Sequence, residues 1–163
     1  MSFRRLGIFA FFFIVLTLHA SALMVSFLVV ETGLNEDAPA NQISTIWESG
    51  LMAAFFDAGH IVTDSPVVRM EKKPSADFTG KIGNDFDEAA AGGSEYFLLG
   101  FLEYKMDGTK TVPVNITLKL YKTGSKELVF EQLFPVGQGK SPADEHQLAQ
   151  SAGQVIAAHI NES

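Results

Sequence analysis

The chain contains no cysteine, and this absence excludes three kinds of chemistry. The chain cannot form a disulfide framework and cannot use a thiolate as a nucleophile. It also lacks the acylated cysteine that anchors a bacterial lipoprotein. With 163 residues it is still long enough for an ordinary domain with a core of its own.

Basic residues are also scarce. The chain carries 12 Lys and Arg against 19 Asp and Glu, which gives a formal net charge of −7 with neutral histidines. A surplus of acid repels phosphate backbones and anionic lipid head groups. We therefore expect neither nucleic acid nor an acidic membrane surface as a main partner. The sequence also has no internal repeat and no low-complexity tract.

The amino-terminal segment has the pattern of a secretory signal peptide. Two arginines precede an apolar run over residues 6–18, and small residues follow at Ala20 and Ala22. A basic start, an apolar stretch of this length and an A-x-A site are typical of a segment that is removed on export. We expect cleavage after Ala22, so that residues 1–22 are a signal peptide and residues 23–163 form a single α/β domain.

The alternative is an uncleaved membrane anchor, because apolar residues resume at Leu23 and continue to Val30. We favour cleavage, since His19 and Ser21 interrupt the apolar run. Membrane contact is expected only if this segment is retained. An exported chain without cysteine fits a periplasmic or secreted localisation.

Residues 41–59 are predicted to form the principal helix. Pro39 lies just ahead of this stretch, and Gly59 follows as a natural residue past the helix end. Apolar residues recur at steps of three and four along one broad stripe. A helix with such a stripe must pack on a flat apolar surface, which the flanking strands can supply. The stripe consists of Ile43, Ile46, Trp47, Gly50, Leu51, Ala54, Phe55 and Ala58.

The segments around this helix are typical of strands and two further helices. Residues 23–30 are almost all apolar, as in a strand buried on both faces, and residues 60–68 form a second strand that Pro66 ends, bulges or places near an edge. A short helix is expected over residues 84–91, and a last helix opens at Ser141. The buried stripe of the last helix is predicted to be Leu148, Ala152, Val155, Ile156 and Ile160.

Three consecutive strands are predicted to form a meander between the last two helices. In the expected register Phe101 faces Ile116, and Leu120 faces Leu128, so that apolar pairs share one face. The predicted order is β-α-β-α-β-β-β-α. This is a two-layer α+β fold with a mixed sheet of about five strands and helices mainly on one face. The three strands span about residues 94–106, 112–121 and 126–136.

The other face of this meander is open if the helices cover only one face. It would then present tyrosines among apolar and polar side chains, a mixture suited to protein contact. The alternative is that these residues are ordinary half-buried strand residues or that a helix covers them. The candidate partner-binding residues are Tyr96, Leu98, Leu102, Tyr104, Lys119 and Tyr121.

The sequence contains three groups of residues that resemble reactive motifs. Residues 139–141, Gly-Lys-Ser, resemble the end of a phosphate-binding loop, but Phe134 stands where the first glycine should be and Pro135 removes a backbone N–H group. We therefore interpret Ser141 as a helix cap. The acids of residues 85–88 lie on the first turn of a short helix, where they complement the helix dipole.

The third group is His60 and Asp64, which share one face of a strand while Ser65 points the other way. A serine–histidine–acid site requires convergence from separate elements onto an exposed nucleophile. We therefore expect no catalytic residue, no metal site and no cofactor.

The layout resembles a group of bacterial envelope modules. Residues 54–60, A-F-F-D-A-G-H, close a helix with a glycine, and a strand beginning I-V-T-D-S-P follows. Similar in outline are the penicillin-binding-protein activator lipoproteins, the curli-secretion channel lipoproteins and the amino-terminal domain of the Tol-system β-propeller protein. The lipobox cysteine of the two lipoprotein groups is absent here. The resemblance covers residues 25–68 by pattern and implies a non-catalytic periplasmic module that binds other envelope proteins.

Three functions are considered. The first, which we favour, is a non-enzymatic exported binding module that contacts another envelope protein. The second is a small-ligand or lipid carrier with an apolar cavity under Trp47 and Phe55. The third is an enzyme centred on His60 and Asp64.

Overall fold

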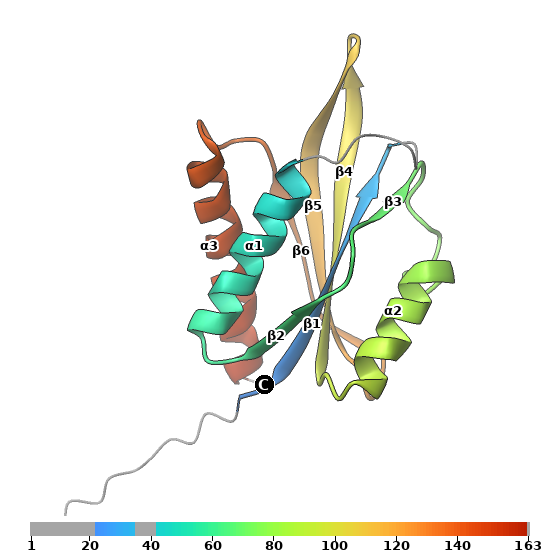
Figure 1. Ribbon diagram of the computed structural model, residues 1–163, viewed down its shortest axis with the longest axis vertical. Coiled ribbons are helices and arrows are strands. Elements are labelled where there is room, and N and C mark those ends of the chain that lie inside the picture. Colours follow the sequence, from blue (N-terminus) through green and yellow to red (C-terminus); the bar gives the residue numbers. More distant parts are fainter. Residues whose placement is uncertain (1–21, 35–41, 163) are drawn as a thin grey trace, which may run out of the picture.

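The computed structural model describes residues 22–34 and 42–162 and shows an α+β fold on one mixed sheet (Figure 1). Residues 1–21, which contain most of the expected signal peptide, lie outside the described residues. The elements are β1 (Met24–Thr32), α1 (Gln42–Asp57), β2 (Ile61–Asp64), β3 (Val68–Met70), α2 (Gly80–Ala91), β4 (Tyr96–Asp107), β5 (Lys110–Lys122), β6 (Glu127–Pro135) and α3 (Pro142–Glu162).

The sheet has a parallel half and an antiparallel half. Its strands lie in the order β2-β1-β4-β5-β6, and β3 pairs with β1 beyond the end of β2. Strand β1 is parallel to β2, β3 and β4, whereas β4, β5 and β6 form an antiparallel meander. The predicted α+β fold with a mixed sheet of about five strands is confirmed. The strand count differs by one, because the strand predicted over residues 60–68 is divided near Pro66 into β2 and β3.

Helices cover both faces of the sheet, because alternate residues of β1 are apolar on both sides. Val25, Phe27 and Val29 belong to the core beneath α1 and α3, and Leu28 and Val30 to the core beneath α2. Figure 1 shows α1 and α3 side by side, with α2 apart from them. Two of the three helices therefore share one face, as expected, and α2 covers part of the other.

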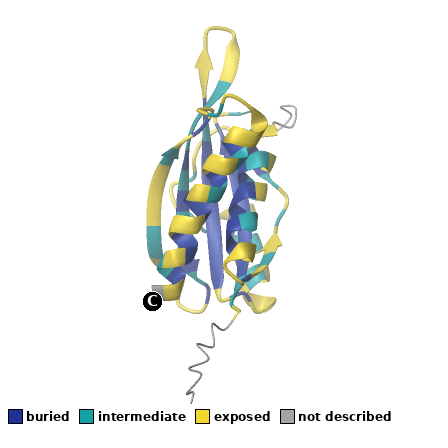
Figure 2. Cartoon of the chain, turned by 90° about the vertical axis from the view of Figure 1, so that its left-hand side faces the viewer, coloured by how far each residue is buried: buried dark blue, intermediate teal, exposed yellow. Residues whose placement is uncertain are grey.

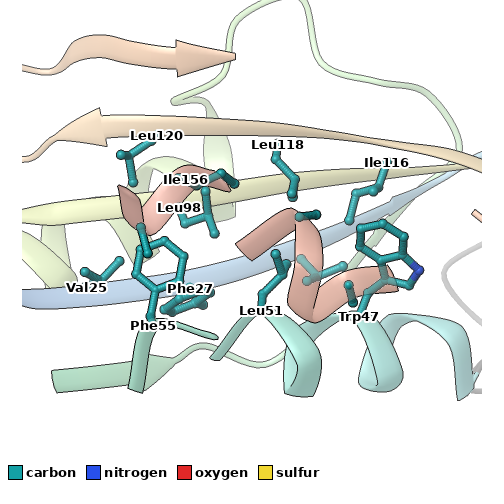
Figure 3. Close-up of a cluster of buried hydrophobic side chains, with 14 of the residues drawn as sticks. Val25, Phe27, Trp47, Leu51, Phe55, Leu98, Ile116, Leu118, Leu120 and Ile156 are labelled. Atoms are coloured by element: carbon teal, nitrogen blue, oxygen red, sulfur yellow. The ribbon is translucent and has the colours of Figure 1, made fainter. Parts of the chain in front are cut away.

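Helices α1 and α3 touch through glycines. A Cβ atom added at Gly50 would lie 2.6 Å from the Cβ of Ala149, and one added at Gly153 would lie 2.7 Å from the Cβ of Ala54. Without side chains at these two positions the helix backbones approach closely. In Figure 3, Trp47, Leu51 and Phe55 of α1 and Ile156 of α3 lie between these helices and the strands of the sheet.

The predicted stripe of α1 is largely confirmed, whereas that of α3 is partly wrong. Leu148 and Val155 are 41% and 50% exposed. Helix α3 packs on α1 as well as on the sheet, so its buried arc turns toward α1 through Ala149, Gly153 and Ala157. The predicted start of the middle helix is also wrong. Helix α2 begins at Gly80, which places buried Ile82 one turn before buried Phe86.

Candidate protein-binding groove

The six candidate partner-binding residues do not form an open face. Tyr96, Leu98, Leu102 and Tyr104 lie in the core beneath α1 and α3 and are 8%, 1%, 0% and 4% exposed. Tyr121 lies in the core on the opposite side of the sheet and is 5% exposed. The condition for an open face is therefore not met, and the alternative holds, in which helices cover these strand residues.

A β-bulge explains the error. Close to the turn β4 and β5 pair as predicted, but the register shifts by one residue between Glu103 and Tyr104. Beyond this point Leu102, rather than Phe101, pairs with Ile116. A shift of one residue exchanges the two faces of one strand relative to the other. The side of β4 that was expected to be open is therefore the one that α1 and α3 cover, whereas Tyr121 of β5 faces the opposite side.

A second register shift moves β6 relative to β5. Leu120 pairs with Phe130 instead of the predicted Leu128. Next to the turn the pairing is already one residue off, since Tyr121 pairs with Leu128, and the register changes by one more residue between Leu120 and Tyr121. Phe130 packs against the core beneath α3, whereas Leu128 is 42% exposed. The predicted extent of this strand is correct to within one residue, but the predicted pairing is wrong.

Lys119, the sixth candidate, is held by carboxylates of its own chain. Its Nζ lies 2.8 Å from Asp77 Oδ2 and 3.6 Å from Glu131 Oε1. The hydroxyl of Tyr121 also donates a hydrogen bond to Asp77. Burial acts to raise the pKa of Asp77, but the hydrogen bonds from Lys119 and Tyr121 outweigh it, so the pKa is lowered. This polar cluster ties the loop before α2 to the sheet.

A second buried cluster lies at the carboxyl end of β1. Glu31, which lies just past the strand predicted over residues 23–30, is 0% exposed. Its carboxylate accepts a hydrogen bond from Arg69 Nε at 2.6 Å and one from the Tyr104 hydroxyl at 3.2 Å. Burial and the neighbouring charge of Glu31 raise the pKa of Tyr104. Because each carboxylate oxygen has a donor, we assign this cluster a structural role.

The phosphate-loop resemblance of residues 139–141 is explained by helix capping. The Ser141 Oγ accepts a hydrogen bond from the Asp144 N–H at 3.2 Å, so the capping interpretation is confirmed. The Gly139 N–H donates to Glu145 Oε2 at 2.8 Å. A depression of about 450 Å³ lies beside Gly139 and Leu148, but this backbone donor is already used within the chain.

His60 and Asp64 differ sharply in their surroundings. His60 is 5% exposed, packs on Phe55 with ring centroids 6.0 Å apart, and has its pKa lowered by burial. Asp64 is exposed at the end of β2. In the described part of the chain no group of three or more His, Cys, Asp or Glu could hold a metal ion.

A groove of about 440 Å³ lies between the outer side of α1 and the edge strand β2. Helix α1 contributes side chains that recur at steps of three and four on the side away from the core. Strand β2 contributes two residues at even spacing, which point to the same face. The groove is lined by Thr45, Glu48, Ser49, Met52, Ala53, Phe56, Asp57, Val62 and Asp64.

Three carboxylates stand beside apolar side chains in this groove. Glu48, Asp57 and Asp64 supply negative charge, and Met52 and Phe56 supply apolar surface. Phe56 is 70% exposed. No Lys or Arg is among the described residues of the lining. This combination is suited to a cationic group on an apolar stem, such as a lysine or arginine side chain.

Glu48 is the least satisfied group of the groove. Its Oε1 atom is buried and, among the residues that the structure describes, has no hydrogen-bond partner. Burial, followed by the negative charge of Asp64, raises the pKa of Glu48 to about 7. A carboxylate in this state would gain from an incoming donor, because an unpaired buried oxygen costs free energy.

Strand β2 offers a free edge beside the groove. Within the described residues it pairs only with β1, and its other edge has no strand partner. Val62 and Asp64 point to the groove side, and Ile61, which is 50% exposed, points to the other side. An edge of this kind can accept an extended segment through backbone hydrogen bonds.

This groove was not predicted from the sequence, although one signal was available. Phe56 lies outside the buried stripe of α1 and is followed by an acid, so it was a candidate for an exposed aromatic residue. The proximity of Asp64 to Glu48 depends on the crossover from α1 to β2, and no pattern in the neighbouring sequence predicts it.

No protein-family model matches the chain, and no curated protein matches its sequence. Solved structures with a similar arrangement include the PelC dodecamer from Paraburkholderia phytofirmans, with a TM-score of 0.46 and 14% identity over 85% of this chain and 87% of that chain. Lipoprotein GNA1162 from Neisseria meningitidis has a TM-score of 0.41 and 14% identity over 85% and 99% of the two chains.

TolB from Acinetobacter baumannii is also similar, with a TM-score of 0.38 and 13% identity over 87% of this chain and 28% of that chain. The resemblance in outline to bacterial envelope modules is therefore confirmed. At these identities the likeness concerns the arrangement of the chain alone. No helix within residues 22–34 and 42–162 is long and apolar enough to cross a membrane.

Proposed function

We propose that the chain is a non-enzymatic, exported module of the cell envelope that binds another envelope protein through the α1–β2 groove. The observation that carries the proposal is the groove itself, in which carboxylates and apolar side chains stand beside a strand edge that has no partner among the described strands. The signal-peptide pattern at the amino terminus supports export to the periplasm or the exterior.

The partner segment is basic and extended. An extended peptide that adds to the β2 edge gains backbone hydrogen bonds and directs every second side chain into the groove. Lysine or arginine at these positions would meet Glu48 and Asp64, and their apolar stems would cover Met52. The acidic net charge of the chain would attract the same kind of segment from a distance.

The absence of an enzymatic role is part of the proposal. Of the two residues considered for catalysis, His60 is buried beside Phe55 and Asp64 lies in the groove. The place considered for a carrier cavity is occupied by packed side chains, since Trp47 and Phe55 are 1% and 0% exposed. The Nε1 of Trp47 donates a hydrogen bond to Glu145 at 2.7 Å.

A defined peptide tests the proposal. The probe is the acetylated and amidated hexapeptide Lys-Val-Lys-Val-Lys-Val, and its matched control is Glu-Val-Glu-Val-Glu-Val. We expect the lysine peptide to shift backbone amide resonances of residues 61–64 and of the outer side of α1, and the glutamate peptide to leave them unchanged. Binding of both peptides alike, or shifts confined to other surfaces, would contradict the proposal.

Charge-neutral variants provide the second arm of this test. At pH 8, where Glu48 is ionised, replacing Glu48→Gln and Asp64→Asn together should weaken binding of the lysine peptide about fivefold to tenfold, because two favourable charge contacts are removed. Asp87→Asn with Glu88→Gln makes the same charge change at exposed positions of α2 and should leave the affinity unaltered. Equal losses in both double variants would show that the peptide senses only net charge.

A further inference from the structure

The hairpin of β4 and β5 extends beyond the rest of the sheet (Figure 2). Strand β1 last pairs at Thr32 with Glu103, and β6 ends at Pro135 opposite Asn115. Past these pairs Val114 O still accepts a hydrogen bond from the Val136 N–H, and Tyr104 lies in the core. Beyond them, within the described residues, the two strands pair only with each other. We call residues 105–112 the hairpin arm. A two-stranded ribbon is marginally stable by itself in water, so the arm would gain from a surface to pack against.

The tip of the arm combines positive charge with an exposed apolar residue. Lys105 and Lys110 are exposed, and the arm has one acid, Asp107. Met106 is 68% exposed. Alternation along β4 places Lys105 and Asp107 on one face of the ribbon and Met106 on the other. Lys110 pairs with Asp107 and shares that face, which therefore carries two positive charges and one negative charge. The arm is therefore a basic end on a chain whose net charge is −7.

The β2 edge has complementary features on its two sides. The groove side carries Asp64 together with Glu48 and Asp57 of α1. The opposite side carries Ile61, which is 50% exposed. A strand of the arm added to this edge can direct Lys105 toward the acids while Met106 covers Ile61. Charge and apolar surface thus match on both sides of one edge-to-edge pairing.

The arm cannot reach the groove of its own chain. Strand β2 pairs with residues 24–27, the amino-terminal half of β1, whereas the arm begins beyond the carboxyl end of β1 at Thr32. Figure 1 shows the arm pointing away from β2. Any contact between the two surfaces must therefore join separate copies.

We propose that the hairpin arm of one copy adds to the β2 edge of a second copy and places its lysines in the α1–β2 groove. This inference rests on the proposed function of the groove and names a second copy of the chain as one of its occupants. The two contacting surfaces are different, so the contact is heterologous. Copies would join head to tail and form a ring where the rotation closes, or a filament where it does not.

Reversed charges on each surface test this contact by sedimentation velocity of the full chain. The arm variant carries Lys105→Glu and Lys110→Glu, and the groove variant carries Asp57→Lys and Asp64→Lys; all four residues are exposed. Each variant alone should lose self-association by at least tenfold. Lys72→Glu with Lys81→Glu makes the same charge change as the arm variant at exposed positions elsewhere and should associate as the unmodified chain does.

Mixing the two variants gives the decisive result. The arm variant retains an intact groove and the groove variant an intact arm, so an equimolar mixture should assemble again, with intact arm in intact groove and reversed arm in reversed groove. A chain carrying all four changes should associate again through the reversed charges. A monomeric unmodified chain at millimolar concentration, or a mixture that fails to pair while the unmodified chain assembles, would overturn the inference.

The two proposals can fail separately. A chain that stays monomeric yet binds the lysine peptide at residues 61–64 retains the proposed function and loses the self-association. A chain that assembles through the arm but fails to bind the peptide retains the arm contact and loses the role of the groove in binding other basic segments.

Discussion

At the scale of single residues, Glu145 joins three segments of the chain. Its carboxylate is buried and accepts hydrogen bonds from Trp47 Nε1 at 2.7 Å, from the Gly137 N–H at 2.9 Å and from the Gly139 N–H at 2.8 Å. These donors come from α1 and from the loop before α3. A single side chain therefore fixes the start of α3 against the principal helix.

Replacing Glu145→Ala should strongly destabilise the fold. The change leaves three donors without an acceptor in a buried place, so we expect the free energy of unfolding to fall by about 3 kcal/mol. Urea denaturation followed by the fluorescence of Trp47 measures the change. Gln147→Ala, at an exposed position of the same helix, is the control and should alter stability by less than about 0.5 kcal/mol. A loss of that small size for Glu145→Ala would contradict the role assigned to the carboxylate.

Glu48 should make the stability of the fold depend on pH. Its pKa is raised from 4.5 to about 7 in the folded chain, mainly by burial and then by Asp64. Between these two values the folded state binds more protons than the unfolded state, so stability decreases as pH rises and the loss is complete above about pH 7. Because the side chain is only half-buried, we reduce the expected loss for solvent screening to about 1 to 2 kcal/mol.

The variant Glu48→Gln isolates this effect. Near pH 8 the variant should be more stable than the unmodified chain by about 1 to 2 kcal/mol, because it has no buried charge at this position. Near pH 5 the Glu48 side chain is protonated in the folded chain, so the advantage should disappear. Urea denaturation at the two pH values provides the measurement. An advantage that is the same at both pH values would contradict the raised pKa.

At the scale of elements, the contact between α1 and α3 depends on the absence of two side chains. In an ordinary helix Gly→Ala stabilises by about 1 kcal/mol. At Gly153 the added methyl would lie 2.7 Å from the Cβ of Ala54 and 3.2 Å from the Leu51 backbone. We expect the clash to outweigh the gain, so that Gly153→Ala lowers the free energy of unfolding by about 1 to 3 kcal/mol.

Gly124→Ala is the matched control for this prediction. A Cβ at Gly124 meets nothing within 4 Å, so the substitution should leave stability nearly unchanged. Thermal unfolding of both variants compares them directly. A Gly153→Ala chain more stable than the unmodified one would show that the helices separate without cost.

Local patterns predicted the helices and strands well, because each pattern involves only residues that are close together in the sequence. The stripe of α1 and the apolar run of β1 needed no partner to be recognised, and Pro66 marked the break between β2 and β3. The pairing of β4 with β5 was not predictable in the same way. One extra residue near Glu103 reverses the faces of the strand, and the apolar residues on both faces conceal the shift.

The candidate site was not predicted from the sequence, because its parts are far apart along the chain. Glu48 and Asp64 come together only through the crossover from α1 to β2. Tyrosine is frequent at protein interfaces, which is why the tyrosines were chosen as contact residues, but Tyr96 and Tyr104 lie beneath two helices. A residue type suited to binding gives no information on which face of a two-sided sheet will be covered.

At the scale of the whole molecule, α1 has two roles. Its inner side fills the core over the sheet through Trp47, Leu51 and Phe55, and its outer side forms one wall of the groove. The groove is therefore built on a rigid, fully packed element, and only β2 on the other side is a short edge strand. Such a wall fixes the spacing of the carboxylates before a partner arrives, which lowers the ordering cost of binding.

The central claim is that the α1–β2 groove binds basic segments through its carboxylates. Its most direct test is the affinity of the Lys-Val-Lys-Val-Lys-Val peptide between about pH 6 and pH 8, measured by calorimetry. Glu48, with a pKa of about 7, becomes charged across this range, so binding should tighten severalfold as pH rises.

Two variants show which side chain causes the pH dependence of the affinity. His146 Nε2 lies 3.4 Å from Ser49 Oγ of the groove, so His146→Gln serves as the control and should retain the tightening. Glu48→Gln should abolish it and bind equally at both ends of the range. An affinity of the unmodified chain that stays constant with pH, or a Glu48→Gln chain that tightens as much, would contradict the account.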